Sequence, residues 1–223
     1  TYNIDLMYAL PGQSKDDLSA DLQQALAFNP PHLSVYHLTM EPNTYFAKHP
    51  PVNLPDEDTA YDMLDMITAA TGAAEMQRYE VSAYARAGHR CEHNLNYWQF
   101  GDYLGLGAGA HGKLSFAHRV LRTVKLRDPQ RYMEAAKAGQ ALAQADEVKR
   151  ADLPFEFMLN ALRLRAGFEL GQFTERTGLP LSAIQKALEQ AESRGLIERD
   201  GTRIKPTERG FDFLSELQAL FLA

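Results

Sequence analysis

The first 85 residues alternate short apolar runs with stretches of helical periodicity. The apolar runs cover residues 3–10, 32–38 and 79–83, and Pro11-Gly12 closes the first of them. Between the runs, apolar residues recur every three or four positions, as on one face of a helix. Because strands that alternate with helices of this length form βα units, the pattern predicts an α/β fold with a parallel sheet.

A glycine-rich stretch follows at residues 103–112. Two strand-like runs, 114–116 and 120–124, flank a short polar gap as in a hairpin, and residues 128–139 have a helical pattern. We therefore predict that the α/β domain spans residues 1–145.

Residues 146–223 follow a different pattern, which predicts a second, helical and winged-helix-like domain. The Asp200-Gly201 pair is a strong hairpin signal between two short strands. The predicted order is helix 153–165, helix 169–177, helix 181–194, strand 196–199, strand 203–205 and helix 207–221.

Charge argues against nucleic acid as a partner. The chain has 29 acidic and 23 basic side chains, and residues 146–223 have 13 acidic and 11 basic ones. DNA affinity depends on clustered Lys and Arg, so a winged-helix interaction or regulatory protein is an alternative that the charge disfavours. No apolar run approaches the roughly 18 residues of a membrane span, and the N-terminus lacks signal-peptide features, so we expect a soluble, cytoplasmic protein.

Cysteine use is restricted to Cys91, which excludes an internal disulfide framework and a cluster site built from several thiolates of this chain. His89, Cys91, His93 and His111 resemble a metal set, but they lack the second ligand pair of structural zinc sites. The chain begins without Met and enters a strand-like run by residue 2, so we expect it to be part of a longer protein.

Residues 107–112 match the dinucleotide-binding pattern G-x-G-x-x-G. That pattern binds a pyrophosphate only where a strand passes into a helix, whereas the residues from Lys113 onwards are strand-like. The glycines therefore indicate either a ligand-binding loop of another kind or a tight crossing of two backbone segments.

Two further features allow both a functional and a structural interpretation. Asp5 and Glu80 stand in apolar runs, where a buried carboxylate needs a hydrogen-bonding neighbour or a ligand. In the element His93-Asn-Leu-Asn-Tyr-Trp98, the imidazole beside aromatic rings suits an axial heme ligand. The alternative is a hydrogen-bonded loop histidine with Tyr97 and Trp98 in the core.

Several spaced motifs occur in order along the chain. They are Asn3-Ile-Asp-Leu-Met-Tyr-Ala-Leu-Pro-Gly-Gln13, Asn29-Pro-Pro-His-Leu-Ser-Val-Tyr36, Glu41-Pro-Asn-Thr44, Tyr79-Glu-Val-Ser-Ala-Tyr-Ala85, His93-Asn-Leu-Asn-Tyr-Trp98 and Gly101-Asp-Tyr-Leu-Gly-Leu-Gly-Ala-Gly-Ala-His111. Together these motifs resemble the oxygen-independent coproporphyrinogen III oxidase-like radical SAM family, and the H-N-x-x-Y-W element is similar to its HemW branch of heme chaperones. The resemblance covers essentially the whole chain.

The resemblance implies that residues 1–145 are the C-terminal part of a partial TIM-type radical SAM barrel. The family binds a [4Fe–4S] cluster through a C-x3-C-x2-C motif that this chain lacks, so the cluster would belong to the preceding part of a longer protein. S-adenosylmethionine would be contacted here by Asp5 at the ribose and by Met7 and Thr39 at the adenosine. Ala9 departs from the family, which usually has Gly at this position.

The function that the resemblance implies is binding of heme and its delivery to acceptor proteins. His93 would ligate the heme iron, with Tyr97 and Trp98 shaping the pocket. The alternative within the family is oxidative decarboxylation of coproporphyrinogen III. Membranes would be contacted only through acceptors, and an exposed sheet edge at residue 3 could pair with a second copy to give a homodimer.

Overall fold

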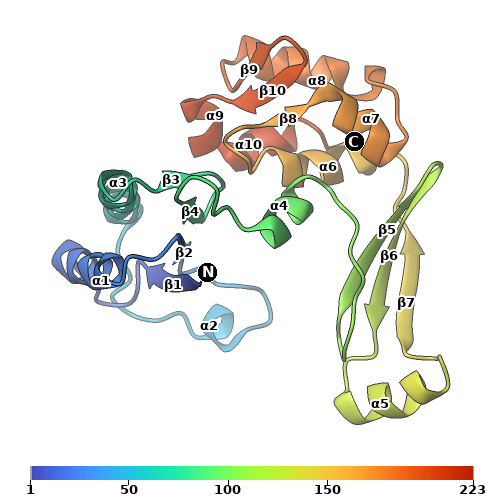
Figure 1. The fold of residues 1–223 in the computed structure, drawn as a ribbon, viewed down its shortest axis with the longest axis horizontal. Helices are drawn as coiled ribbons and strands as arrows, with labels where there is room; N and C mark the ends of the chain where they lie inside the picture. Colours follow the sequence, from blue (N-terminus) through green and yellow to red (C-terminus); the bar gives the residue numbers. More distant parts are fainter. Residues whose placement is uncertain (1, 223) are drawn as a thin grey trace. The chain divides into compact units, whose positions relative to one another are not determined.

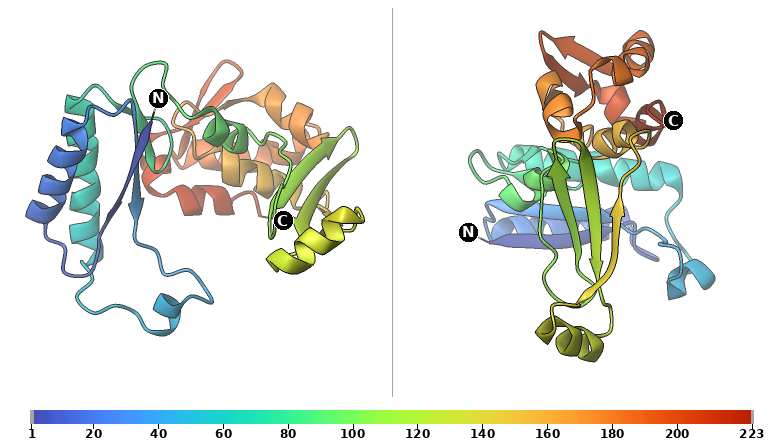
Figure 2. Two further views of the ribbon diagram at one scale, coloured as in Figure 1. Left: turned by 60° about the horizontal axis from the view of Figure 1, so that its bottom comes forward. Right: turned by 90° about the vertical axis from the view of Figure 1, so that its right-hand side faces the viewer.

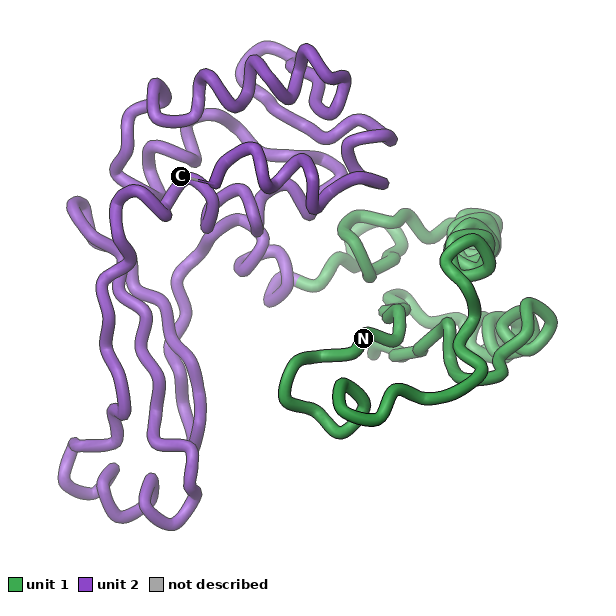
Figure 3. Tube along the Cα trace, turned by 180° about the vertical axis from the view of Figure 1, so that it is seen from behind, with its two compact units in different colours: residues 1–91 green, residues 92–223 purple. Residues whose placement is uncertain are grey.

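The structure is a computed structural model that describes residues 2–222, and it divides into two compact units, residues 1–91 and 92–223 (Figure 3). The domain boundary predicted between residues 145 and 146 lies inside strand β7 (Leu142–Glu147). This strand pairs with β6 (Arg119–Lys125), so a boundary there would divide a hydrogen-bonded sheet.

Unit 1 contains a four-stranded sheet with the order β1-β2-β4-β3 (Figure 1). Its strands are β1 (Asn3–Tyr8), β2 (His32–His37), β3 (Gln77–Arg78) and β4 (Ala83–Ala85). β1 and β2 are parallel, as predicted, and β1 lies at an edge of the sheet.

The third apolar run does not form the parallel strand that we expected. β4 is antiparallel to both β2 and β3, and residues 79–82 form the turn between β3 and β4. Side-chain hydrogen bonds stabilise this turn: the Arg78 guanidinium donates to the carbonyl of Val81 from Nε at 3.1 Å and from Nη2 at 2.6 Å, and the Ser82 N–H donates to the Glu80 carboxylate at 2.8 Å. A hairpin therefore replaces a βα crossover at this point.

Two helices cover one face of this sheet, α1 (Lys15–Ala27) and α3 (Glu57–Ala73) (Figure 2). Ser14 and Asp17 form a capping box at the start of α1. Leu18 and Ile67 are fully buried in the core between the helices and the sheet, and each such side chain contributes about 2 kcal/mol. The short helix α2 (Tyr45–Lys48) lies in the connection from β2 to α3.

Ala9, which follows β1, has a φ of 56°. In this left-handed region a methyl group costs roughly 1 kcal/mol, which is the physical reason that glycine suits the position.

Unit 2 begins with α4 (Glu92–Trp98) and a three-stranded antiparallel sheet of β5 (His111–Phe116), β6 and β7. The β5–β6 hairpin is the predicted one, and α5 (Pro129–Lys137) is the predicted helix, which lies at one end of the sheet (Figure 1). β7 was not predicted from the sequence, because all of its residues are exposed and its sequence has no apolar alternation.

The rest of unit 2 has the predicted order of helices and strands, with two differences. An additional strand, β8, joins the last sheet, whose order is β8-β10-β9, and the final helix is divided at Phe213. Phe157, Phe168 and Phe173 form edge-to-face contacts at the centre of its core. The elements are α6 (Leu153–Ala161), β8 (Phe168–Glu169), α7 (Leu170–Thr177), α8 (Ser182–Ser193), β9 (Ile197–Asp200), β10 (Arg203–Pro206), α9 (Glu208–Asp212) and α10 (Leu214–Ala219).

Within residues 2–222, no helix combines the length and the apolar character that a membrane crossing requires.

Candidate functional site

The face of the unit 1 sheet opposite α1 and α3 is polar. Along β1, Ile4 and Leu6 pack toward the helices, so Asn3, Asp5 and Met7 point to the other side. The register places Asn3 beside His32 and Asp5 beside Ser34 on β2. We call Asn3, Asp5, His32, Ser34 and Tyr79 the unit 1 polar face.

Asn3 is the centre of a hydrogen-bond network on this face. Its Oδ1 lies 2.6 Å from His32 Nδ1 and accepts a hydrogen bond from the Ser34 hydroxyl at 3.2 Å. Its Nδ2 donates to Asp5 Oδ1 at 2.7 Å. A carbonyl oxygen can only accept, so His32 Nδ1 must carry a proton.

The other nitrogen of His32 faces a tyrosine hydroxyl. Nε2 lies 2.9 Å from Tyr79 Oη, which also accepts the backbone N–H of Cys91 at 3.3 Å. Burial lowers the pKa of His32, although the nearby carboxylates of Glu80 and Asp5 oppose this effect. A neutral imidazole with its proton on Nδ1 satisfies every one of these contacts.

The predicted S-adenosylmethionine contacts lie on or next to the polar face. Asp5 is exposed, whereas we expected a carboxylate buried on both faces, because β1 is an edge strand with one face uncovered by helices. Met7 is 44% exposed on the same face. Thr39 follows β2, and its hydroxyl donates to the His37 carbonyl at 3.1 Å. The carboxyl ends of the parallel strands β1 and β2 meet at one edge, so Met7 and Thr39 both lie toward that edge.

Sequence reasoning missed Asn3, His32 and Tyr79 as members of this network. The signal was present in the alternation of His32 and Ser34 with apolar residues, because period-two polarity places such side chains on one face of a strand.

The second candidate site is carried by α4. The element His93 to Trp98 is helical and not the loop of our structural alternative. His93 is exposed, and its ring makes an edge-on contact with Tyr97 at a centroid distance of 4.8 Å, as residues one helical turn apart can. Tyr97 in turn contacts Tyr103 at 4.5 Å, and both Tyr97 and Trp98 are partly buried instead of being core residues.

Trp98 is the last residue of α4, and the guanidinium of Arg163 lies over its ring. The Arg163 guanidinium carbon is 4.1 Å from the centroid of the Trp98 ring. The indole N–H is buried and has no hydrogen-bond partner within residues 2–222.

The segment after α4 is fastened to the helix by close backbone contacts. The Gly101 N–H donates to the Asn96 carbonyl at 2.7 Å, and the Asn96 amide donates to the Asp102 carbonyl at 3.0 Å. A Cβ on Gly101 would lie 2.1 Å from Asn96 Oδ1 and 2.7 Å from its carbonyl oxygen, so only glycine fits here without a shift.

Lys113 on β5 holds the segment after α4, residues 100–102, through its side chain. Its buried ammonium donates to the Phe100 carbonyl at 2.9 Å, to Asp102 Oδ1 at 3.0 Å and to the Ser115 hydroxyl at 2.8 Å. Burial lowers the pKa of Lys113, although Asp102 opposes it. Burial raises the pKa of Asp102, but hydrogen bonds from Ser115 and Lys113 outweigh that effect and hold it below its usual range.

The glycine-rich loop is a close crossing of two backbone segments. Tyr103 and Lys113 exchange two backbone hydrogen bonds, at 3.0 and 2.9 Å. The loop leads into strand β5 and not into a helix, so its G-x-G-x-x-G match does not have the geometry of a pyrophosphate site.

The four residues whose spacing resembles a metal-binding set, His89, Cys91, His93 and His111, do not form a metal site in the described residues. Within residues 2–222, no three His, Cys, Asp or Glu side chains lie where they could hold a metal ion together.

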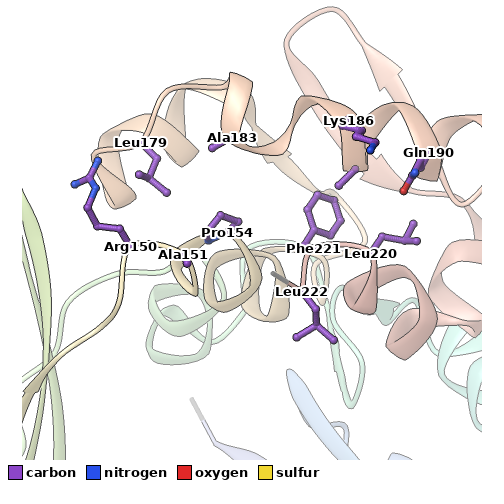
Figure 4. A pocket seen from close by; sticks show the side chains of 11 residues that line it. Arg150, Ala151, Pro154, Leu179, Ala183, Lys186, Gln190, Leu220, Phe221 and Leu222 are labelled. Atoms are coloured by element: carbon purple, nitrogen blue, oxygen red, sulfur yellow. The ribbon is translucent and has the colours of Figure 1, made fainter.

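Unit 2 also contains an open groove of about 500 Å³ between α8, the start of α6 and the chain end (Figure 4). Phe221 and Leu179 are among its apolar lining residues, and Arg150 and Lys186 are the cations that line it. Nothing in the described part of the chain shows what covers it.

The chain is similar over its whole length to heme chaperones of several bacteria. It is 45% identical to the heme chaperone HemW of Escherichia coli and 42% identical to that of Haemophilus influenzae, in each case over 100% of this chain. The HemW of Bacillus subtilis is 31% identical over 99% of it. The chain spans 57–58% of the length of these relatives.

Residues 148–213 match the family model described as the HemN C-terminal domain. The solved structure of coproporphyrinogen III oxidase (HemN) from Escherichia coli, described as a radical SAM enzyme, superposes with a TM-score of 0.74 at 20% identity. It covers 98% of this chain and 54% of that one. The chain is thus a homologue of the HemW heme chaperones, and it has a HemN-like α/β fold.

Proposed function

We propose that this chain is the part of a HemW-type heme chaperone that binds heme and delivers it to acceptor proteins. His93 ligates the heme iron, and Tyr97 and Trp98 form the wall beside it. The observation that carries the proposal is the exposed imidazole of His93, presented on α4 beside a chain of aromatic rings.

The chemistry of α4 suits heme. A neutral imidazole is a common axial ligand of heme iron, and aromatic rings supply apolar contact for the porphyrin face. His93 has space for a large ligand because it is exposed, while Tyr97 is fixed by contact with Tyr103. The names of the relatives favour heme transfer over decarboxylation of coproporphyrinogen III.

S-adenosylmethionine fits the unit 1 polar face. Asp5 offers an exposed carboxylate that Asn3 orients, which suits the two hydroxyls of a ribose. Met7 and Thr39 would contact the adenosine. When bound, this molecule would supply the radical chemistry of the superfamily.

A [4Fe–4S] cluster does not fit the residues present. Such clusters use several thiolates, and Cys91 is the only cysteine of this chain. The cluster of the full-length relatives is therefore assigned to no residue here.

The proposal also includes the domains. The unit 1 sheet with its helices is the C-terminal part of a radical SAM barrel, and the part of the chain after β7 is a winged-helix-like domain. The protein acts in the cytoplasm, does not bind nucleic acid, meets membranes only through acceptors, and forms a homodimer through the edge of β1.

The test is a heme titration of this 223-residue chain, followed by the Soret band and by the fluorescence of Trp98, the only tryptophan. Heme should quench this fluorescence, and His93→Ala should shift the Soret band and weaken affinity by about tenfold or more.

His89→Ala and His111→Ala are the matched controls, because both residues are exposed histidines. Each should bind heme like the unsubstituted chain. An unchanged spectrum and affinity in His93→Ala would exclude His93 as the ligand, and a change in one control would move the site to that residue.

A further inference from the structure

α4, which presents His93, is too short to be stable without support. It has seven residues, none of which is buried. Helices shorter than about 12 residues are marginal in isolation, so contacts of its partly buried side chains must hold it. Trp98, at its end, makes one such contact.

Arg163 supports Trp98 from the end of α6. Its guanidinium carbon lies 4.1 Å from the ring centroid, well inside the range of a cation–π contact. Its backbone N–H donates to the Asn160 carbonyl at 3.1 Å, which fixes the residue close to α6. The stacked cation is therefore attached to the core of unit 2.

The buried indole N–H of Trp98 has no hydrogen-bond partner among the described residues. A buried donor without a partner is unfavourable, so the ring keeps this position because its other contacts outweigh the loss. A planar guanidinium that stacks on the ring supplies such a contact, and it is more weakly hydrated than an ammonium.

We propose that Arg163 is a positioning residue that holds Trp98 by stacking, fixes the end of α4, and thereby orients His93 and Tyr97 for heme. This inference rests on the proposed function of α4. Arg163 acts through Trp98 and does not ligate the iron.

The test compares Arg163→Gln and Arg163→Lys in the 223-residue chain with two measurements. Acrylamide quenching of Trp98 fluorescence, recorded without heme, reports whether the ring remains covered. Heme titration reports the affinity of the site. We expect Arg163→Gln to increase quenching and to weaken heme binding about tenfold, and Arg163→Lys, which keeps the charge but not the planar group, to be intermediate.

Arg165→Gln is the matched control. Arg165 also stacks on a ring, at 4.6 Å from the Phe211 centroid, and pairs with Glu208 at 2.5 Å, but it belongs to a different contact. Its replacement should change neither the quenching of Trp98 nor the heme affinity.

The two proposals fail in different ways. If the unsubstituted chain binds heme and both Arg163 variants bind it equally well, the positioning role is overturned and the proposed function stands. If the unsubstituted chain binds no heme, the proposed function is overturned, and the positioning role falls with it. Should Arg163→Gln fail to fold, Arg163→Lys with unchanged quenching and affinity would still overturn the positioning role.

Discussion

The two candidate sites are held by different forces. On the unit 1 polar face, side chains from two strands and a turn fix one another by hydrogen bonds, with Asn3 at the centre. On α4, ring contacts and a stacked guanidinium hold the aromatic side chains. The first arrangement depends on the protonation state of His32, and the second depends on packing.

The two sites should differ in how strongly they respond to substitutions outside the site itself. Strand register places the polar face directly, because Asn3 and His32 are partners in the β1–β2 pairing. α4 buries no residue of its own and relies on the segment of residues 100–102 and on Lys113. We therefore expect substitutions in residues 100–102 or at Lys113 to affect the α4 site more strongly than comparable substitutions affect the polar face.

The largest expected effect is that of Lys113→Met. It removes three hydrogen bonds, leaves the Phe100 carbonyl without its ammonium donor and takes the buried cation away from Asp102, which keeps the Ser115 N–H, so unit 2 should lose about 3 kcal/mol of unfolding free energy. Urea unfolding followed by Trp98 fluorescence measures this loss.

Lys137→Met, on the exposed surface of α5, is its control and should change stability by less than about 0.5 kcal/mol. Hydrogen exchange of the β1 and β2 amides should be unaltered in both variants. A Lys113→Met chain as stable as the Lys137→Met chain would contradict the anchoring role.

Gly101→Ala should have the next largest effect. The new methyl group would overlap the Asn96 carbonyl, so the end of α4 must move, at a cost of about 2 kcal/mol. The same urea experiment measures it, and a shift in Trp98 emission would accompany it.

Gly72→Ala provides the comparison in unit 1. Gly72 lies in α3, and a Cβ added there would meet no atom within 4 Å, so alanine should stabilise the helix by about 0.5 kcal/mol. We expect Gly101→Ala to lower the free energy of unfolding and Gly72→Ala to raise it. A stabilising Gly101→Ala would disprove the close approach of residue 101 to Asn96.

Tyr79→Phe tests the hydrogen bonds of the polar face. The substitution removes the hydroxyl that contacts His32 Nε2 and the Cys91 N–H, and we expect a loss of about 1 kcal/mol in unit 1. Hydrogen exchange of β2 should accelerate, whereas Trp98 fluorescence should not change. Tyr45→Phe, at an exposed position of α2, serves as the control, and equal exchange rates in the two variants would argue against the network.

The smallest effect is a pH dependence confined to unit 1. Because the folded pKa of His32 lies below its usual value of 6.5, the unfolded chain binds more protons at mildly acidic pH. Stability from this residue is present above pH 6.5 and is lost as the pH falls through the folded pKa.

Hydrogen exchange of β1 and β2 between about pH 7.5 and 5, corrected for the intrinsic exchange rate, follows this loss. His32→Asn should weaken the dependence, and His89→Asn, at an exposed position, should retain it. Equal pH profiles for the two variants would show that His32 does not carry the effect.

The sequence by itself determined the features that depend on neighbours along the chain. The capping box of Ser14 and Asp17, the β5–β6 hairpin and the helices of unit 2 follow from side chains within a few residues of one another. The family resemblance was equally local, since its motifs are short runs, and the homology to HemW heme chaperones confirms it. The S-adenosylmethionine and heme residues remain predictions.

Only the tertiary structure decided how distant residues meet. The direction of β4, the exposure of Asp5 and the partners of His32 depend on which strand lies beside which, and His32 is 29 residues from Asn3 and 47 from Tyr79. The contact of Trp98 with Arg163 likewise joins the end of α4 to the residues just after α6, and a whole sheet separates the two in the chain. Periodicity in the sequence indicates which face of a helix or strand is apolar. Which element packs against that face depends on the packing of the whole unit, so a local sequence pattern does not predict it.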